Sequence, residues 1–263
     1  MLKRIIVGVS IAAIGWKTYA GIRRWRATWG ADPDEALRPL PGDDLVEAPL
    51  STDTRGITIQ APIEQVWPWL VQMGYGRGGW YSIDQLDMRG PSANRIIDEW
   101  QALGVGDVIP THPGGGFEVK VMEPGRALVL YADTSTMRPL DTADSKIVPA
   151  GLAASGAFMS ATPSEFMATW AFVLEPLDMD RTRLIERVRY WGAEGNAASN
   201  VALSFMGFGV FVMMQRQMVG IRTRAERLAL EPRPAPSLAP APSTGDGQTP
   251  ELTDTVAMEV APA

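Results

Sequence analysis

The sequence predicts a single α+β domain at residues 56–230, because a paired set of strands precedes one long helix. Residues 166–175 and 183–191 alternate between apolar and polar side chains, which is typical of strands with one buried face. The turn residues of 176–181 join these strands, so they should form a hairpin. From residue 200 to residue 230 the apolar side chains recur with helical spacing. Hydrophobic residues make up 46% of the chain, enough to bury a core between the two parts.

Shorter elements are expected along the rest of this domain. Residues 56–60 alternate like a strand, and a helix is expected at residues 63–73. Pro68 lies inside this helix and should kink it, because proline lacks the N–H that the helix requires. The first half of the C-terminal helix is apolar nearly all round and is therefore expected to be buried. Three further strands are expected, at residues 105–109, 117–122 and 127–133.

Residues 1–30 combine an apolar run with basic residues and are interpreted as a membrane segment. The run covers residues 5–22 and is broken only by Lys17. A helix of this length is about 27 Å long, just enough to cross a bilayer core. A single-pass anchor is the favoured interpretation; a signal peptide cleaved after Ala20 and an interfacial or core-packed helix are the alternatives. Basic residues are denser after the run than before it, which predicts a cytoplasmic domain.

Three other segments lack a clear period. Residues 31–55, interrupted by prolines and a glycine, are expected to be a connecting arm. The Ser/Thr/Ala/Pro-rich residues 134–164 are expected to form a flexible insertion. Residues 231–263 hold seven prolines and few large apolar groups, so a disordered tail is expected.

Composition excludes several kinds of site. The chain has no cysteine and a single histidine, His112, so disulfides, thiolate ligands and multi-histidine metal sites are excluded, and no metal or cofactor is expected. A net charge of −6 argues against a nucleic-acid partner. Residues 74–79 match the G-x-G-x-x-G pattern, but they follow a predicted helix instead of a strand. They are therefore interpreted as a flexible loop at a cavity entrance.

Several segments, in this order, resemble the START-like (SRPBCC, polyketide cyclase/dehydrase-type) superfamily. They are residues 57–67 (ITIQAPIEQVW), 169–176 (TWAFVLEP), 182–189 (TRLIERVR) and 218–226 (MVGIRTRAE). Residues 67–74 (WPWLVQMG) and 78–82 (GGWYS) further resemble an uncharacterised bacterial subgroup that often carries an N-terminal apolar segment. The resemblance implies a helix-grip fold, in which a curved antiparallel sheet encloses a long C-terminal helix and an apolar cavity. Members of the superfamily bind lipids, sterols, polyketides or other hydrophobic molecules, and some are cyclases or hydrolases.

Strand alternation points to Glu186 as a candidate functional residue. If Leu184 and Val188 face inward, so do Glu186 and Tyr190, whereas the arginines at 183, 187 and 189 face water. An inward carboxylate is costly unless it is paired or hydrogen-bonded. Glu186 is therefore predicted to orient a ligand or to act as an acid or base, or else to be a paired structural carboxylate.

A second group of candidates follows the glycine-rich loop. Trp80, Tyr81 and Asp84 are expected either to line the cavity mouth or to be structural, with the aromatic rings packed under the loop and Asp84 capping a helix at residues 85–88. On the strands and the last helix, further apolar wall is expected from four aromatic residues. The complete set of predicted ligand-binding residues is Trp80, Tyr81, Asp84, Trp170, Glu186, Tyr190, Phe205 and Phe208.

The favoured functional prediction is a membrane-anchored protein that binds a hydrophobic small molecule or lipid in an internal cavity. One alternative is a cyclase/dehydrase- or hydrolase-type enzyme, for which Glu186 and Asp84 are the available acid/base residues. The other is a non-catalytic interaction module at the membrane that uses residues 134–164 or the tail.

Overall fold

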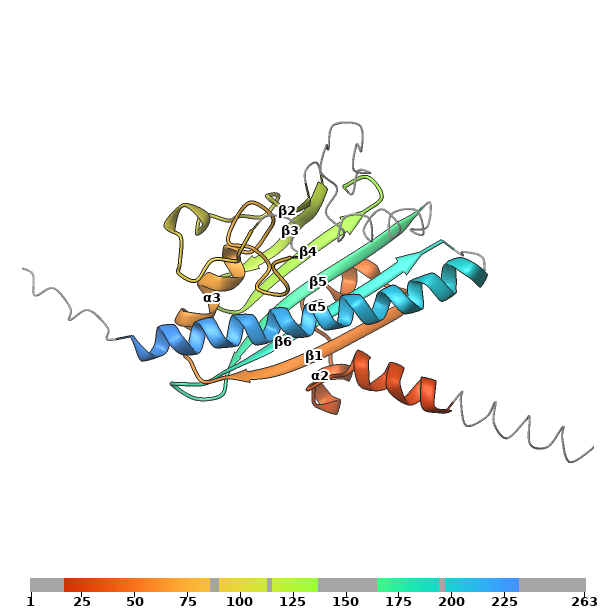
Figure 1. The fold of residues 1–263 in the computed structure, drawn as a ribbon, viewed down its shortest axis with the longest axis horizontal. Coiled ribbons are helices and arrows are strands. Elements are labelled where there is room, and N and C mark those ends of the chain that lie inside the picture. Colours follow the sequence, from red (N-terminus) through yellow and green to blue (C-terminus); the bar gives the residue numbers. More distant parts are fainter. Residues whose placement is uncertain (1–16, 86–89, 113–114, 137–164, 194–196, 232–263) are drawn as a thin grey trace, which may run out of the picture. The chain divides into compact units, whose positions relative to one another are not determined.

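The computed structural model describes residues 17–85, 90–112, 115–136, 165–193 and 197–231, with only the backbone for residues 112 and 197–206. The predicted helix-grip fold is confirmed. A six-stranded antiparallel sheet, in the order β1-β6-β5-β4-β3-β2, curls around the long helix α5 (Figure 1). The strands are β1 (Ser51–Ile59), β2 (Val108–His112), β3 (Gly115–Glu123), β4 (Ala127–Asp133), β5 (Phe166–Pro176) and β6 (Thr182–Gly192). The helices are residues 17–27, α2 (Pro33–Leu37), α3 (Ile63–Val71) and α5 (Ala197–Leu230), with short 3-10 turns at Asp43–Val46 and Asp98–Trp100.

The predicted hairpin forms the middle of the sheet. β5 and β6 pair in continuous antiparallel register, with Trp170 opposite Val188 and Phe172 opposite Glu186. Both strands are rich in β-branched and aromatic residues, which fit a pleated and well-packed surface. A shift of this register by one residue would turn every side chain to the other face of the sheet, so the register determines which side chains face α5.

Two strands differ from their predicted bounds. β1 begins at Ser51, five residues before the predicted start at Gly56, and it pairs with β6 along its whole length. Residues 52–55 are all polar, so no apolar alternation marks this part of the strand in the sequence. Gly56 lies in the middle of the strand, where the Arg183 guanidinium packs closely over it. The strand expected at 105–109 is instead β2 at Val108–His112.

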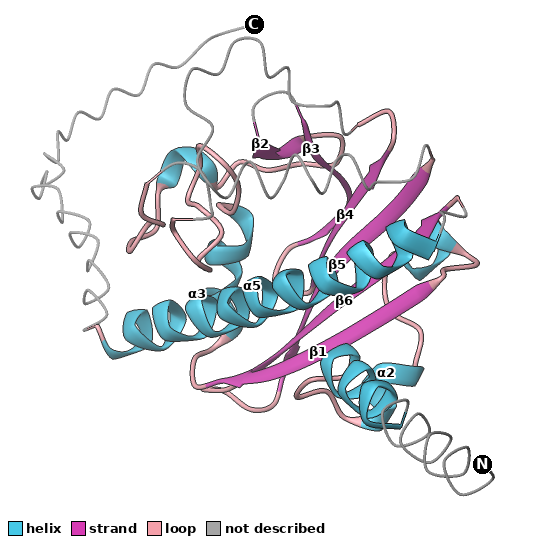
Figure 2. Ribbon diagram, turned by 45° about the vertical axis from the view of Figure 1, so that its right-hand side comes forward, coloured by secondary structure: helices cyan, strands magenta, loops and turns pink. Residues whose placement is uncertain are grey.

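The segment 31–55 is an integral layer of the fold, which corrects its prediction as a connecting arm. Residues 32–46, called the arm below, lie on the face of the sheet opposite α5 (Figure 2). Leu40 packs there against Val173 and Ile185. Gly42, at φ +84°, lies directly over Val129 and leaves no room for a side chain.

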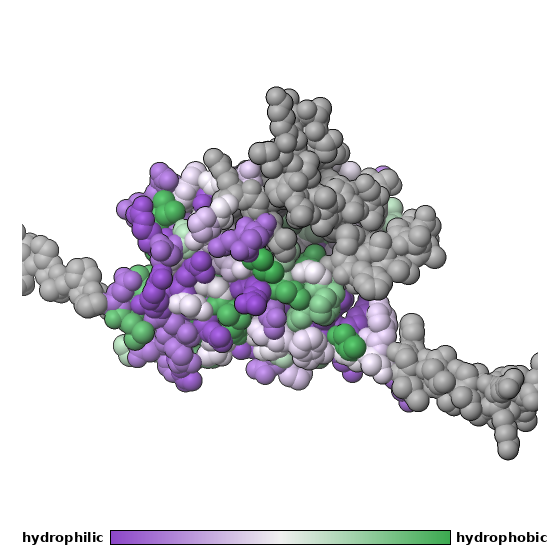
Figure 3. Space-filling model, in the orientation of Figure 1, coloured by the Kyte–Doolittle hydropathy of each residue, from purple (hydrophilic) through white to green (hydrophobic). Residues whose placement is uncertain are grey.

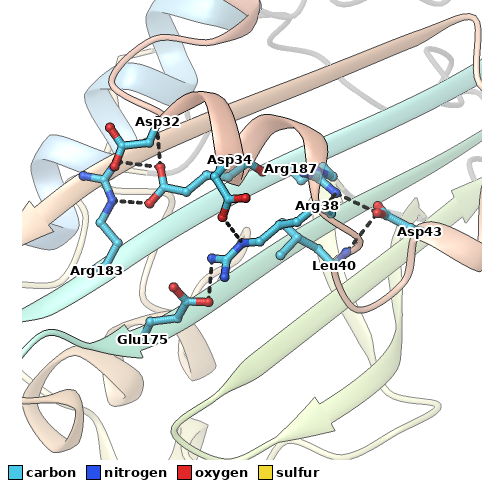
Figure 4. Close-up of polar contacts among 9 residues, drawn as sticks. Asp32, Asp34, Arg38, Leu40, Asp43, Glu175, Arg183 and Arg187 are labelled. Carbon is cyan, nitrogen blue, oxygen red and sulfur yellow. Dashed lines mark hydrogen bonds and ion pairs between the residues drawn. The ribbon is translucent and has the colours of Figure 1, made fainter.

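The prediction that three arginines of β6 face water is also wrong, because the arm covers them. Arg187 has only 3% of its side chain exposed. Its guanidinium donates to the Glu35 and Arg38 carbonyls and to the Asp43 carboxylate, at 2.6–2.9 Å (Figure 4). Arg183 forms a two-pronged ion pair with Glu35, at 2.7 and 2.8 Å. Arg189 donates to the Val46 carbonyl.

The core lies between the other face of the sheet and α5. Met218, Ile221 and Ala225 of α5 join one apolar cluster with inward residues of the strands and with α3. The first half of α5 was expected to be buried, but Phe208 and Val210 are exposed. Among the described side chains of residues 207–216, Phe211 and Met214 are buried against the rest of the domain.

Some predictions fall on residues outside the described ranges. These are most of the apolar run at 5–22, most of the insertion at 134–164 and nearly all of the tail at 231–263. Within the described residues, no helix has the length and apolar character needed to cross a membrane.

Candidate functional site

A buried polar cluster occupies the sheet face that meets α5. β1 and β6 place Arg55 directly opposite Glu186. Both side chains are almost completely buried. Ionised groups are costly to bury unless each is paired or hydrogen-bonded, so the partners of these two residues define what the cluster can do.

Glu186 has one satisfied and one unsatisfied carboxylate oxygen. Trp170 Nε1 donates a 2.6 Å hydrogen bond to Oε1, whereas Oε2 is buried with no hydrogen-bond partner among the described residues. Burial raises the pKa of Glu186 to about 7, against the opposing effects of the Arg55 charge and the Trp170 hydrogen bond. The inward orientation predicted for Glu186 is therefore present, and its carboxyl group titrates near neutral pH.

Arg55 is the basic member of the cluster and was not among the predicted site residues. Its guanidinium donates to the Asp53 carboxylate at 2.6 Å and to the Arg26 carbonyl at 3.3 Å. It also contacts Met214 Sδ at 3.4 Å and lies 5.5 Å from the centre of the Phe211 ring. Strand alternation is the sequence signal for Arg55, since it lies on the same strand face as Ile57 and Ile59. The predicted strand begins at Gly56 and so does not include Arg55.

Aromatic rings form the wall beside Glu186. Trp80 and Trp170, both predicted site residues, stack with 5.3 Å between ring centres and 13° between planes. Phe117 and Phe172 also contact Trp170, at 5.6 and 5.1 Å between ring centres. The structure therefore brings the predicted site residues Trp80 and Glu186 to the same indole, that of Trp170.

Tyr81 is a packed core residue and does not line an open cavity entrance. It is buried, and its hydroxyl donates to the Trp69 carbonyl at 3.0 Å. Burial raises the pKa of Tyr81, so the phenol stays protonated. The Arg224 guanidinium covers its ring at 4.8 Å from the centre. These contacts agree with the structural alternative for this residue.

Asp84 fastens the loop that carries Trp80 and Tyr81. Its Oδ1 accepts hydrogen bonds from the backbone N–H and the hydroxyl of Ser92, at 3.0 and 2.8 Å. The Ser92 hydroxyl oxygen in turn accepts from the Tyr81 N–H. The helix that Asp84 was expected to cap falls largely on residues 86–89, outside the described ranges.

The remaining predicted residues are Tyr190, Phe208 and Phe205. Tyr190 is half-buried and stacks on Phe166, with 6.4 Å between ring centres. Phe208 is exposed on α5, so it supplies no interior wall. The side chain of Phe205 is outside the described part of the chain.

Gln217 is a second buried acceptor that the sequence did not single out. Its Nε2 contacts Met73 Sδ at 3.5 Å, and its Oε1 has no partner among the described residues. It lies on α5 three residues after Met214, which contacts Arg55. Gln217 can be recognised in the sequence as a polar residue on the buried stripe of the helix that also contains Met214, Met218 and Ile221.

Comparison with known proteins reveals likeness at the level of structure. No family model and no curated protein matches the sequence. Similar solved structures include a protein from Mesorhizobium loti, with 16% identity and a TM-score of 0.36 over 67% of this chain and 98% of that one. A Polyketide_cyc-like protein from Corynebacterium glutamicum has 18% identity and a TM-score of 0.25 over 68% and 89%. Norcoclaurine synthase from Thalictrum flavum, solved with dopamine and hydroxybenzaldehyde, has 10% identity and a TM-score of 0.36 over 75% and 96%. These neighbours are similar to this chain in fold, and the helix-grip assignment itself rests on the strand order and on α5.

Proposed function

We propose that the protein is a START-like binder of a hydrophobic small molecule or lipid, held between the sheet and α5. The observation that carries this proposal is Glu186 Oε2, a fully buried carboxylate oxygen without a partner among the described residues. A buried acceptor left unsatisfied costs about 1–3 kcal/mol, and more when it is charged. A ligand that donates a hydrogen bond to this oxygen removes that cost.

The surroundings of Glu186 indicate what kind of ligand fits. Aromatic rings of Trp80, Trp170 and Phe172 provide apolar contact area. The acceptors Glu186 Oε2 and Gln217 Oε1 provide two places for donors. Ligand sites commonly combine an apolar lining with a few such polar groups that orient the ligand. The ligand class is therefore an apolar molecule that carries a hydroxyl or amine group.

Native mass spectrometry of the full-length protein, followed by organic extraction, tests this proposal. The purified wild-type protein should carry a co-purifying apolar molecule, seen as a defined mass increment. Glu186→Leu should lose it, because a methyl group replaces the acceptor. Glu123→Gln, which neutralises an exposed carboxylate on β3, should keep it. A wild-type protein that carries no such molecule, and gains none from an added lipid extract, would contradict the proposal.

Acid–base catalysis is the second candidate function, and the pKa of Glu186 near 7 favours it. A general acid or base works best when its pKa lies near the operating pH. Asp84, the other carboxylate expected for an enzyme, is engaged with Ser92, whereas Asp53 is the carboxylate whose charge raises the Glu186 pKa further. Any turnover found with the extracted molecule should fall at least about 100-fold in Glu186→Gln. Unchanged turnover in that variant would remove the assignment.

The anchor at residues 5–22 remains part of the proposal, since a membrane is the source of apolar ligands. The interaction-module alternative depends on residues 134–164 and on the tail, which lie almost entirely outside the described ranges.

A further inference from the structure

Two segments that are far apart in the sequence lie side by side at one end of the domain. The helix at residues 17–27 meets the first half of α5 (Figures 1 and 2). The Trp25 ring contacts the Phe211 ring, with 5.3 Å between centres and 64° between planes. A Cβ at Gly207 would lie 3.4 Å from the Arg26 guanidinium. The two segments therefore present a shared surface, called the N-terminal face below.

The N-terminal face exposes large apolar side chains. The exposed fractions are 47% for Tyr19, 50% for Ile22, 54% for Trp25 and 51% for Phe208, whose ring contacts Phe211 beside Trp25. Apolar surface over α5 is visible in the space-filling view (Figure 3). Single exposed apolar residues are ordinary, but a group of them on two adjoining helices indicates an interaction site.

All formal charges of these two helical segments are positive. Residues 17–27 contain Lys17, Arg23, Arg24 and Arg26, and residues 207–216 contain Arg216, with no acidic residue in either segment. The chain as a whole has a net charge of −6, so this local excess is a strong asymmetry.

We infer that the N-terminal face docks the folded domain on an anionic lipid bilayer. Aromatic and aliphatic side chains enter the interfacial region of a membrane, while flanking arginines attract anionic lipid headgroups. A second copy of this chain is a poorer occupant, because a two-fold contact would place like charges of both copies together. The docked surface adjoins the buried polar cluster of the proposed ligand site, since Phe211 contacts Trp25 on one side and the Arg55 guanidinium on the other.

Single cysteine labels on the full-length protein test this inference, because the chain has no cysteine of its own. An environment-sensitive fluorophore is placed at Phe208→Cys on the face, and at Met179→Cys in the exposed turn between β5 and β6. The proteins are mixed with vesicles of equal parts phosphatidylcholine and phosphatidylglycerol, whose acyl chains are brominated in a parallel set. The label at 208 should shift to the blue and be quenched by bromine, whereas the label at 179 should do neither.

Charge variants separate docking from simple attachment through the N-terminal run. Arg23→Ala with Arg24→Ala should reduce the ratio of docked to undocked label about 30-fold, since each basic residue near an anionic surface contributes roughly a factor of five. Arg126→Ala with Arg181→Ala changes the net charge equally at exposed sites elsewhere and should leave the ratio unchanged.

Three outcomes would overturn the inference. Protein that co-sediments with vesicles while the label at 208 stays in water would show attachment without docking. Equal quenching at both labels would show adsorption without orientation. A blue shift at 208 that depends on protein concentration and needs no vesicles would show an interface between copies of the chain.

Discussion

At the scale of single residues, Glu186 couples protonation to folding. Its carboxyl group is fully buried, and its pKa in the folded protein is about 7, against 4.5 for an ordinary glutamate. Between these two values the folded state binds more protons than the unfolded state. The free energy of unfolding contributed by this group therefore falls as the pH rises through that window.

Replacing Glu186 by glutamine should remove this pH dependence while keeping an acceptor for Trp170. A pKa rise from 4.5 to about 7 corresponds to roughly 3 kcal/mol, lost progressively as the pH rises through the window. Urea denaturation of wild type and Glu186→Gln at about pH 5 and about pH 8 measures the difference. The variant should gain stability relative to wild type at the higher pH, whereas Glu123→Gln should track wild type at both. A difference between Glu186→Gln and wild type that does not change with pH would contradict the assignment.

At the scale of elements, α5 is positioned against the loop that carries Tyr81. Tyr81 has a positive φ of 58°, which is unusual for a residue with a side chain and bulk at Cβ. The Tyr81 N–H donates to the Ser92 hydroxyl oxygen, and the Tyr81 hydroxyl donates to the Trp69 carbonyl. The Arg224 guanidinium of α5 packs over the Tyr81 ring. Gly220 brings the α5 backbone directly over the Tyr81 carbonyl, where no Cβ fits.

Two glycines of α5 offer a matched test of this contact. Gly220→Ala should destabilise the protein by about 1–3 kcal/mol, because the new methyl group overlaps the backbone of Tyr81. Gly209→Ala meets nothing within 4 Å and should stabilise the helix by up to about 1 kcal/mol. Urea denaturation followed by circular dichroism measures both. Equal effects of the same sign would show that Gly220 has no special packing role.

At the scale of the whole molecule, the arm connects the beginning of the domain to its central hairpin. Glu35 and Arg187 belong to segments 152 residues apart in the chain, yet the Arg187 guanidinium donates to the Glu35 carbonyl. The Arg183 ion pair stabilises the same contact. Burial opposes ionisation of Glu35, but the hydrogen bonds from Arg183 and from the Asp32 N–H outweigh it and lower its pKa. The arm is therefore part of the folding unit.

Arg187→Ala should destabilise the protein by about 3–5 kcal/mol, because it leaves the Glu35 and Arg38 carbonyls without the Arg187 donor and removes the closest cation from the Asp43 carboxylate. Arg126→Ala, at an exposed ion pair, should change the free energy of unfolding by less than about 1 kcal/mol. Guanidinium denaturation measures both variants. A cost below about 1 kcal/mol for Arg187→Ala would mean that the arm is not coupled to the sheet.

The sequence by itself determined the features that depend on local periodicity. The hairpin of β5 and β6, the long C-terminal helix and the inward orientation of Glu186 all follow from spacings of two or of three to four residues along the chain. These spacings involve residues close together in the chain, so they can be recognised without knowledge of the fold.

Only the tertiary structure decided which surfaces are covered and which partners meet. Arg187 has the spacing of a water-facing residue, but residues more than 140 positions away cover it. Arg55 lies opposite Glu186 because of the register of β1 on β6. Phe208 has the character of a core residue, yet it is exposed because it lies off the stripe of α5, with Phe211, Met214 and Met218, that is buried against the domain. Burial is a relation between segments distant in sequence, so side-chain spacing within one segment does not contain it.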